Sequence, residues 1–492
     1  MDKLTYESAN GFTPVWSAQQ QAIFGWFATG LGNLIVMARA GTGKTTTIKH
    51  AFEFAPENRM LYCVFNKKNQ IEAQEKIKDP RVEVKTLHAV GFAFIKKVWS
   101  KARPDYQVET DRVDIIASRE QSTVKTAIRR LVGFAKNTLI NATVSDLEDI
   151  CSERDIDCDD QNVSQEKLAN YALQVLELSK QPDPQNRISF DDMVWLPVAM
   201  GWAKATYDLV VVDESQDMNL PQLFMARQAC KPGGRVCVVG DDRQAIYNFR
   251  GAATDGMGLM KQELSAQELG LTITYRCPKS VVNIASQLVP DYVAADSAPE
   301  GTVDEMKPDA LVTNAKPGDA ILSRLNAPLM PLCLSFIRAG MPAKIEGRDI
   351  GKALLAIVWK LKAKSVPHFL ERVESWRTTQ VNRALKTRNG DKKASDINDQ
   401  AETLIAVAEG ATSVNDIQNK LESIFADVGN SSNVILLSST HKAKGLEWNR
   451  VFLLADTYNR RSTNASAQAL REEQNIYYVA VTRSKNHLTF VR

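Results

Sequence analysis

The sequence is short of several features that mark common classes of protein. Its seven cysteines are scattered, odd in number and never spaced as Cys-x-x-Cys, which argues against a disulfide framework or a four-ligand zinc site. The 25 glycines and 18 prolines among 492 residues are too few for a fibrous or disordered chain. Lys plus Arg (61) nearly equals Asp plus Glu (58), so the protein is not globally basic. Any nucleic-acid-binding surface must therefore be local, and reduced cysteines fit a cytoplasmic location.

An uninterrupted apolar run long enough to cross a membrane is also missing. The first ten residues do not combine a basic region with an apolar one, so no secretory signal is expected. Residues 8–38 carry no charge, but the glutamines at 19–21 and the turn sequence at 30–33 divide them. A membrane span needs about 20 consecutive apolar residues. We therefore predict a helix at 18–28 and a buried strand at 34–37, without contact with a membrane.

Short apolar runs recur along the chain in a pattern typical of buried parallel strands. Continuous rather than alternating apolar strands, with helical periodicity between them, indicate sheets that are covered on both faces. The runs are Leu34–Met37, Leu61–Phe65, Leu209–Val212, Val236–Val239, Val434–Leu437 and Val451–Leu454. Residues 101–185 and 352–430 lack such runs, and the first of these regions has helical patterns at Val124–Ala135 and Gln165–Leu178. We predict an α/β protein in which helical insertions interrupt the α/β cores.

The first motif that carries chemistry follows the strand at 34–37. Residues 38–46 read Ala-Arg-Ala-Gly-Thr-Gly-Lys-Thr-Thr and match G-x-x-x-x-G-K-[ST], except that Ala38 takes the first glycine position. In such a strand–loop–helix turn the backbone N–H groups wrap phosphates, and the helix N-terminus favours negative charge. The lysine reaches the β- and γ-phosphates, and the threonine after it can ligate Mg²⁺. The predicted phosphate-binding residues are Ala40, Gly41, Thr42, Gly43, Lys44, Thr45 and Thr46.

A second motif ends the apolar run at 209–212. The sequence Asp-Glu-Ser-Gln-Asp follows that run and places Asp213 at the carboxyl end of a strand, where it can hold Mg²⁺ together with Thr45. Glu214 can polarise the attacking water. An acidic surface turn is the alternative, but the phosphate-binding motif upstream favours a nucleotide triphosphatase. These two motifs leave open what the hydrolysis drives.

Further polar blocks along the chain narrow the interpretation. They are Val238–Ala252 (VVGDDRQAIYNFRGA), Tyr275-Arg276, Ser323-Arg324, Thr440–Glu447 (THKAKGLE) and Asn475–Lys485 (NIYYVAVTRSK). In order, spacing and residue identity, these blocks resemble those of UvrD/Rep-like superfamily 1 DNA helicases. The resemblance extends from Gln20 to the C-terminus, whereas the two helical insertions resemble the family only in position.

The resemblance implies roles in binding the adenosine of ATP. Gln20 resembles the glutamine that reads adenine through its amide, although Gln19 or Gln21 is an alternative match because the three run together. Tyr275 would stack on the adenine ring. Glu447 resembles the carboxylate that binds the ribose.

The resemblance also implies roles at the γ-phosphate. Arg276 and Arg483 match the two arginines that reach it, and their guanidinium groups would stabilise charge on the transferring phosphoryl group. An interdomain salt bridge is the alternative for each of them. Gln244 matches the residue that senses the γ-phosphate or the attacking water.

Contacts with single-stranded DNA are implied by a third set of matches. Exposed aromatic rings stack on bases without sequence preference, worth about 1–3 kcal/mol each, and cationic side chains add phosphate contacts. The alternative for Phe65 or Phe249 is a place in the core. The matching residues are Phe65, Asn66, Thr86, His88, Tyr247, Phe249, Arg250, Thr440 and His441.

The family's architecture implies two RecA-like P-loop NTPase cores. The expected divisions are 1–100 with 186–268 for the first core, 101–185 for its insertion, 269–351 with 431–492 for the second core and 352–430 for its insertion. ATP and Mg²⁺ would bind between the cores and drive movement with 3′→5′ polarity along single-stranded DNA, with unwinding at junctions between single- and double-stranded DNA. Repair, recombination or replication is the expected context. We expect a monomer whose helical insertions offer surfaces for protein partners.

Three departures from the family pattern qualify this expectation. Arg39 stands where the family usually has glycine, and its side chain could point to solvent or touch nucleotide or DNA. The insertion at 352–430 is short, which motivates an alternative: a DNA-stimulated ATPase that remodels protein–DNA complexes, alone or within a larger repair or defence complex, without efficient unwinding. The Ile188–Asp192 segment (ISFDD) is not a departure, because it resembles a short family stretch before the strand that ends at Asp213; its aspartates could contact Mg²⁺-bound water, but we favour a cap for the following helix. No nuclease block follows Arg483, so we expect no fused nuclease.

Overall fold

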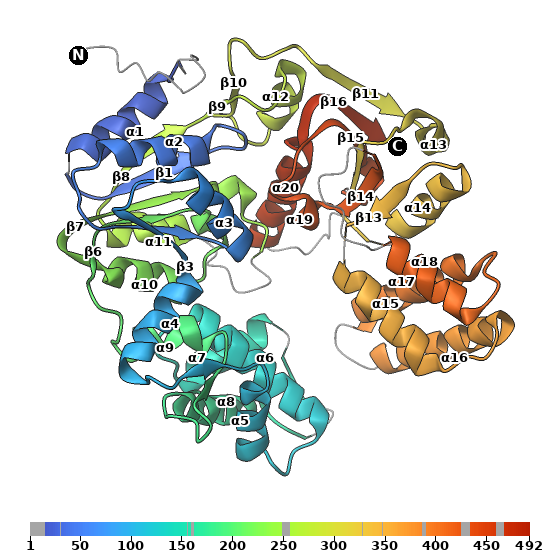
Figure 1. Ribbon diagram of the computed structural model, residues 1–492. Coiled ribbons are helices and arrows are strands. Elements are labelled where there is room, and N and C mark those ends of the chain that lie inside the picture. The colour runs from blue at the N-terminus through green and yellow to red at the C-terminus, as the bar shows by residue number, and fades with distance from the viewer. Residues whose placement is uncertain are drawn as a thin grey trace. The chain divides into compact units, whose positions relative to one another are not determined.

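The computed structural model describes residues 15–29, 31–154, 156–158, 162–247, 256–326, 328–346, 348–385, 390–424, 433–458 and 467–492. They form two compact units, the first ending at Thr272 and the second beginning at Ile273 (Figure 1). Each unit contains a six-stranded sheet in which every strand pairing is parallel. The predicted α/β class is therefore confirmed.

The sheet of unit 1 brings together strands that are far apart in the sequence. Their spatial order is β3 (Val82–Thr86), β2 (Met60–Val64), β6 (Tyr207–Val212), β7 (Cys230–Gly240), β1 (Leu34–Ala38) and β8 (Gln267–Leu271). The four strands predicted in this unit are confirmed as β1, β2, β6 and β7. The two edge strands, β3 and β8, were not predicted because charged residues interrupt their apolar pattern. Because all strands run the same way, their carboxyl ends form one edge of the sheet.

Helices cover both faces of this sheet. Leu34 and Val36 of β1 belong to one buried cluster with α1 (Ala18–Thr29) and α2 (Lys44–Ala51). Ile35 points to the opposite face, into a cluster that includes α4 (Leu87–Val98), α10 (Leu220–Ala229) and α11 (Gly256–Glu263). The alternation of side chains along a strand requires this two-sided burial, which is why the strand reads as a continuous apolar run.

The first helical insertion has its own core, which it shares with α4 and with α9 (Asp192–Ala199). Its helices are α5 (Val108–Ile116), α6 (Ser122–Thr138), α7 (Val144–Glu153) and α8 (Gln165–Ser179), which gather beyond α4 and α9 in Figure 1. The two helices predicted here are confirmed, because α6 contains residues 124–135 and α8 contains residues 165–178.

A buried cluster of charges joins this insertion to α9. Asp192, fully buried, accepts hydrogen bonds from Lys136 Nζ at 2.7 Å and from Arg112 Nη1 at 2.6 Å. Lys136 also donates to Glu109 at 2.6 Å. Reciprocal bonds between Asp192 and Ser189 close the turn before α9. The predicted cap is thus correct in part, but Asp192 serves mainly as the anion that neutralises two buried cations.

The sheet of unit 2 has a similar all-parallel organisation. Its order is β11 (Thr302–Met306), β16 (Ser484–Val491), β15 (Trp448–Leu454), β12 (Ala320–Ser323), β14 (Ile435–Ser439) and β13 (Ala343–Ile345). The strands predicted at 434–437 and 451–454 are confirmed as β14 and β15. A separate short pair, β9 (Ile273–Thr274) with β10 (Val293–Ala294), begins the unit.

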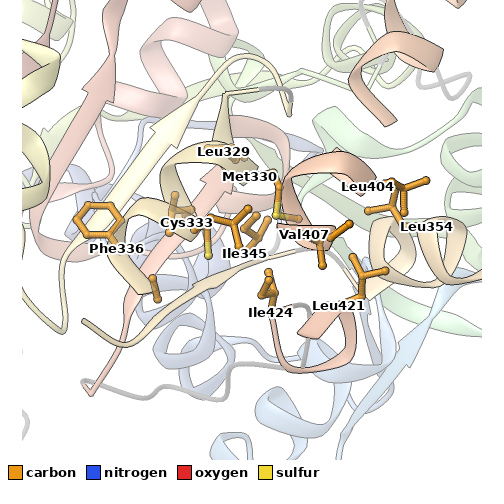
Figure 2. Packing of buried hydrophobic residues seen from close by; sticks show 14 of the residues in the cluster. Leu329, Met330, Cys333, Phe336, Ile345, Leu354, Leu404, Val407, Leu421 and Ile424 are labelled. Atoms are coloured by element: carbon orange, nitrogen blue, oxygen red, sulfur yellow. The ribbon is translucent and has the colours of Figure 1, made fainter. Parts of the chain in front are cut away.

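The second insertion shares one continuous core with this sheet. It consists of α15 (Arg348–Leu361), α16 (Val366–Ala384), α17 (Gly390–Ala408) and α18 (Val414–Ile424). Figure 2 shows side chains from these helices, among them Leu354, Leu404 and Leu421, packed with Cys333 of α14 (Leu329–Arg338) and Ile345 of β13. Among the described helices of both units, none has the length and hydropathy needed to cross a membrane.

Candidate functional site

The phosphate loop of unit 1 connects β1 to the N-terminus of α2. Gly41 and Gly43 have positive φ angles of 71° and 77°, a conformation that other residues adopt only at a cost. Thr42 is buried, and its hydroxyl donates to the Arg39 carbonyl at 2.9 Å. Lys44 and Thr45 begin α2. The loop therefore has the strand–loop–helix geometry in which backbone N–H groups can bind a phosphate.

Two carboxylates at the end of β6 face this loop. Lys44 Nζ lies 3.0 Å from Asp213 Oδ1 and 2.6 Å from Glu214 Oε1. Asp213 Oδ2 also accepts a hydrogen bond from the buried Tyr62 hydroxyl at 2.5 Å. Burial alone would lower the pKa of Lys44, but the two carboxylates outweigh it and raise that pKa above its ordinary value. Glu214 has a left-handed backbone with φ of 53°, a strained conformation often found at functional sites.

These residues fit a divalent cation. The ammonium of Lys44 rests on Asp213 and Glu214, which shows that the carboxylates accept a positive charge at this point. Hard oxygen donors suit Mg²⁺, which is usually held by one or two carboxylates plus substrate phosphates and water. Within the described ranges, no group of three or more His, Cys, Asp or Glu side chains could hold a metal ion. The predicted pair of Thr45 and Asp213 is consistent with such a sparse site.

The three consecutive glutamines of α1 have different partners. Gln20 is buried, and its amide nitrogen donates to Thr47 of α2 at 2.9 Å. Gln19 instead exchanges hydrogen bonds with Thr272, and Gln21 donates to a backbone carbonyl at the protein surface. Gln20 is therefore the glutamine that lies against the phosphate-loop helix. Its role in reading adenine stays a prediction.

Residues after β7 are tied to the phosphate loop. The Arg39 side chain, 10% exposed, places Nη1 3.0 Å from Asp241 Oδ1 and 2.5 Å from Asp242 Oδ1. Asp241 Oδ2 accepts a hydrogen bond from Gln244 Nε2 at 2.8 Å. The possibility that Arg39 points to solvent is thereby wrong, because two carboxylates hold its charge beside the loop.

Most of the predicted DNA-contacting residues of unit 1 lie at the same edge of the sheet. Phe65, 37% exposed, and Asn66 follow β2, and Thr86 ends β3, next to β2 in the sheet. Asn66 and Thr86 each accept a backbone hydrogen bond at the start of a helix. Burial lowers the pKa of His88, so this residue is mostly neutral at pH 7.

The third stretch that was matched to DNA contacts follows β7. Tyr247 is half-buried beyond the end of β7. Phe249 and Arg250 lie outside the described residues. All of these DNA assignments stay predictions.

In unit 2, three of the residues matched to ATP lie close together, two of them after β9 and one just before β15. Arg276 follows β9, and its Nε lies 2.6 Å from Glu447 Oε2, just before β15. Lys485 Nζ lies 3.5 Å from the other oxygen of Glu447. Burial would raise the pKa of Glu447, but the two cations outweigh it and hold that pKa low. Glu447 is thus an anion that organises Arg276, and Tyr275 beside it is 52% exposed.

Arg483 is buried just before β16. Its Nε donates to the Val479 carbonyl at 2.7 Å and its Nη1 to the Leu446 carbonyl at 3.2 Å. Burial, reinforced by Arg276, lowers the pKa of Arg483 to about 10, which still leaves it cationic at pH 7. No described carboxylate forms an ion pair with Arg483. Its Nη2 donates to the Thr482 hydroxyl at 3.1 Å, so neutral oxygens hold the guanidinium and leave its charge available to an anion.

Thr440 and His441 follow the carboxyl end of β14 in unit 2. They therefore lie at the other end of the strands from Glu447, which precedes β15. Thr440 is fully buried, and its hydroxyl is 2.6 Å from that of Tyr458 and donates to the Ser323 carbonyl at 3.3 Å. The structure therefore separates these residues from Arg276 and Glu447, because a parallel sheet keeps the two ends of its strands apart. Their predicted contact with DNA stays untested.

Several residues of the site were assigned no role from sequence. Tyr62 belongs to an apolar strand, and nothing in the pattern signals that its hydroxyl meets Asp213. Gln216 donates to Glu214 at 2.6 Å and accepts from the backbone of Asp241 at 3.1 Å, so it links the ends of β6 and β7. Gln216 and Asp241 both stand in blocks that were recognised, and only their mutual contact was hidden.

Comparison with known proteins places this arrangement in a family. A model of the UvrD/REP helicase N-terminal domain matches residues 16–265, and a model of the UvrD-like helicase C-terminal domain matches residues 351–492. The chain is 23% identical over 506 residues to the F-box DNA helicase protein 1 of Schizosaccharomyces pombe, covering 92% of this chain and 55% of that protein.

Two bacterial relatives match over shorter lengths. A probable DNA helicase II homolog of Mycoplasma pneumoniae is 23% identical over 307 residues, 56% of this chain and 42% of that protein. The ATP-dependent DNA helicase PcrA of Bacillus subtilis is 24% identical over 320 residues, 59% of this chain and 41% of that protein. The chain thus spans about half the length, or less, of these curated relatives. Since the N-terminal model alone matches residues 16–265, more than half of the 492 residues, the chain belongs to the UvrD/Rep helicase family.

Proposed function

We propose that this protein is an ATP-dependent DNA motor that binds single-stranded DNA and couples ATP hydrolysis to 3′→5′ movement and duplex unwinding. The observation that carries the proposal is the contact of Lys44 with Asp213 and Glu214 at the mouth of a phosphate loop. A phosphate-binding lysine and two strand-end carboxylates are the parts that nucleotide hydrolysis requires. Family membership, together with relatives named as DNA helicases, favours DNA as the track.

The residues of unit 1 divide the chemical work. The backbone of residues 40–43 and the N-terminus of α2 bind the phosphates, while Lys44 leaves the carboxylates and moves to the β- and γ-phosphates. Thr45 and Asp213 would hold Mg²⁺, which would neutralise part of the phosphate charge. Glu214 orients the attacking water and accepts its proton.

Unit 2 supplies positive charge for the same reaction. Arg276 is oriented by Glu447, and Arg483 is held rigidly by backbone carbonyls. Guanidinium groups that are placed in advance stabilise charge as it develops on the transferring phosphoryl group. Tyr275, exposed on the surface of its unit, is available to stack on adenine.

The DNA track follows the same edge of unit 1 as the ATP site. Phe65 and Asn66 after β2 lie beside the end of β6, which carries Asp213. This proximity allows a change at the phosphates to alter the base-contacting surface through neighbouring strand ends. We propose that Phe65, and Phe249 beyond Tyr247, stack on bases.

A second candidate function is translocation without efficient unwinding. The observation that favours it is the second insertion, a short four-helix group that shares its core with the sheet of unit 2. Such a protein would displace other proteins from single-stranded DNA, in repair, recombination or defence. ATPase stimulated by DNA would be retained, while strand separation would be weak.

One set of assays decides between these functions. ATPase activity and strand displacement are measured on 3′-tailed, 5′-tailed and blunt duplexes, with the Lys44→Ala variant as the control for contaminating ATPase. The motor proposal predicts DNA-stimulated hydrolysis and unwinding of the 3′-tailed duplex. Hydrolysis without unwinding favours the translocase. The absence of DNA-stimulated hydrolysis on any substrate refutes both.

A further inference from the structure

The phosphate loop and the segment after β7 are joined by an ion cluster within unit 1. Arg39 lies one residue after β1, and Asp241 and Asp242 follow β7, the neighbouring strand. A single nitrogen of Arg39, Nη1, contacts both carboxylates, at 3.0 Å and 2.5 Å. The side chain of Arg39 is 10% exposed and that of Asp241 is 2% exposed, so the pair is shielded from water. Shielded ion pairs hold their geometry better than exposed ones.

The same cluster fixes the orientation of Gln244. Only the nitrogen of an amide can donate to a carboxylate, so the 2.8 Å contact between Gln244 Nε2 and Asp241 Oδ2 sets which way the amide faces. Asp241 Oδ1 therefore contacts Arg39 and accepts from the backbone N–H of Arg243, while Oδ2 accepts from Gln244. Arg39 and Gln244 thus contact the same carboxylate, and through Asp241 the position of the Arg39 cation bears on the orientation of Gln244.

The backbone at this point is also fitted tightly against the segment that follows β6. Gly240 ends β7, and an added Cβ there would lie 2.5 Å from Gln216 Oε1 and 2.6 Å from Ser215 Oγ. Gln216 in turn donates to Glu214. Hydrogen bonds and ion pairs thus run from Arg39 through Asp241 and Gln216 to Glu214, the residue that also contacts Lys44.

We propose that Arg39 is a positioning residue for ATP hydrolysis, which holds Asp241 so that Gln244 presents its amide oxygen to the attacking water or the γ-phosphate. This inference rests on the proposed ATPase function. Without the cation, Asp241 would either rotate or be left as an unpaired buried carboxylate, and Gln244 would lose its fixed orientation. A displacement of about 1 Å at a reacting group can lower a rate by about 10²-fold.

Two substitutions test this role. Arg39→Met keeps an unbranched side chain but has no donor, and Arg39→Lys keeps a positively charged nitrogen. We expect kcat for ATP to fall about 10- to 100-fold in R39M, with the KM for ATP changed by less than about threefold, because Lys44 and the loop backbone remain. R39K is expected to recover kcat to within about threefold, since one nitrogen makes both contacts in the native protein.

The matched control is Arg227→Met, which removes an exposed ion pair with Glu263 elsewhere in unit 1. Its kcat and KM should equal those of the wild type. The inference is overturned if R39M keeps the wild-type kcat, if its KM rises as much as its kcat falls, or if R39K is as impaired as R39M. A wild-type chain without ATPase activity would instead overturn the proposed function, and this inference with it.

Discussion

The buried charges around Asp192 allow a prediction whose size can be estimated. Asp192→Asn removes the anion that Lys136 and Arg112 share, while the side chains of Lys136 and Arg112 are 0% and 4% exposed. Leaving a buried charge without its partner costs about 3–5 kcal/mol, and the amide can recover about 1 kcal/mol as a neutral acceptor. Glu109, 18% exposed, remains as an anion in contact with both cations. We therefore expect local destabilisation of about 2–4 kcal/mol.

Hydrogen exchange is the suitable assay, because a chain with two units does not unfold in one step. Amide protection in α6 and α8 should fall roughly 30- to 1,000-fold in D192N, at about 1.36 kcal/mol per factor of ten. Strands of the unit 2 sheet provide the internal control and should be unchanged. Lys136→Met should have a similar effect, because it leaves the buried Asp192 carboxylate without one of its two cations. Protection in α6 that changes by less than about threefold in D192N would refute the estimate.

A double substitution tests whether the charges act as a unit. D192N with K136M removes both members of the pair whose two side chains are fully buried, and leaves Arg112 with Glu109. Their combined cost should be smaller than the sum of the single costs by about 1–3 kcal/mol, and an additive result would refute a shared cluster. The pKa of Asp192 is lowered, since Lys136 and Arg112 outweigh the opposing effect of burial. Its contribution to stability is therefore complete above about pH 4 and is lost as the pH falls through that lowered pKa.

Three further predictions concern the ATP site, the thiols and the second insertion. Lys44→Ala should abolish ATP turnover without unfolding the chain, as judged by circular dichroism; turnover retained with DNA present would contradict the site assignment. Burial raises the pKa of Cys151 and Cys230 to about 11 and of Cys333 to about 12, so these thiols should react slowly with Ellman's reagent at pH 8 and fully after denaturation; rapid labelling of the native protein would count against it. Leu404→Ala, at a fully buried site, should cost about 2–5 kcal/mol, measured as lost amide protection in both α14 and α17; loss confined to α17 would show that the core is not shared.

Local pattern was sufficient wherever one physical requirement dominated. Runs such as Leu209–Val212 are apolar on every residue because both faces of the sheet are covered, and the strands followed directly from that signal. The phosphate loop could also be predicted from the sequence, since the positive φ angles at Gly41 and Gly43 favour glycine at both positions. The edge strand β3 could not be predicted in this way, because its sequence, VEVKT, mixes apolar and charged residues that are only partly buried.

Contacts between distant residues were beyond the reach of sequence patterns. The sequence by itself determined the α/β class, the phosphate loop, the strand-end carboxylates and the resemblance to one helicase family. Only the tertiary structure decided that Arg39 pairs with Asp241 and Asp242, that Asp192 neutralises Lys136 and Arg112, and that Thr440 is buried. The physical reason is that a parallel sheet brings together strand ends separated by 202 or 203 residues, and the partner of each charge is set there by distance in space rather than by spacing along the chain.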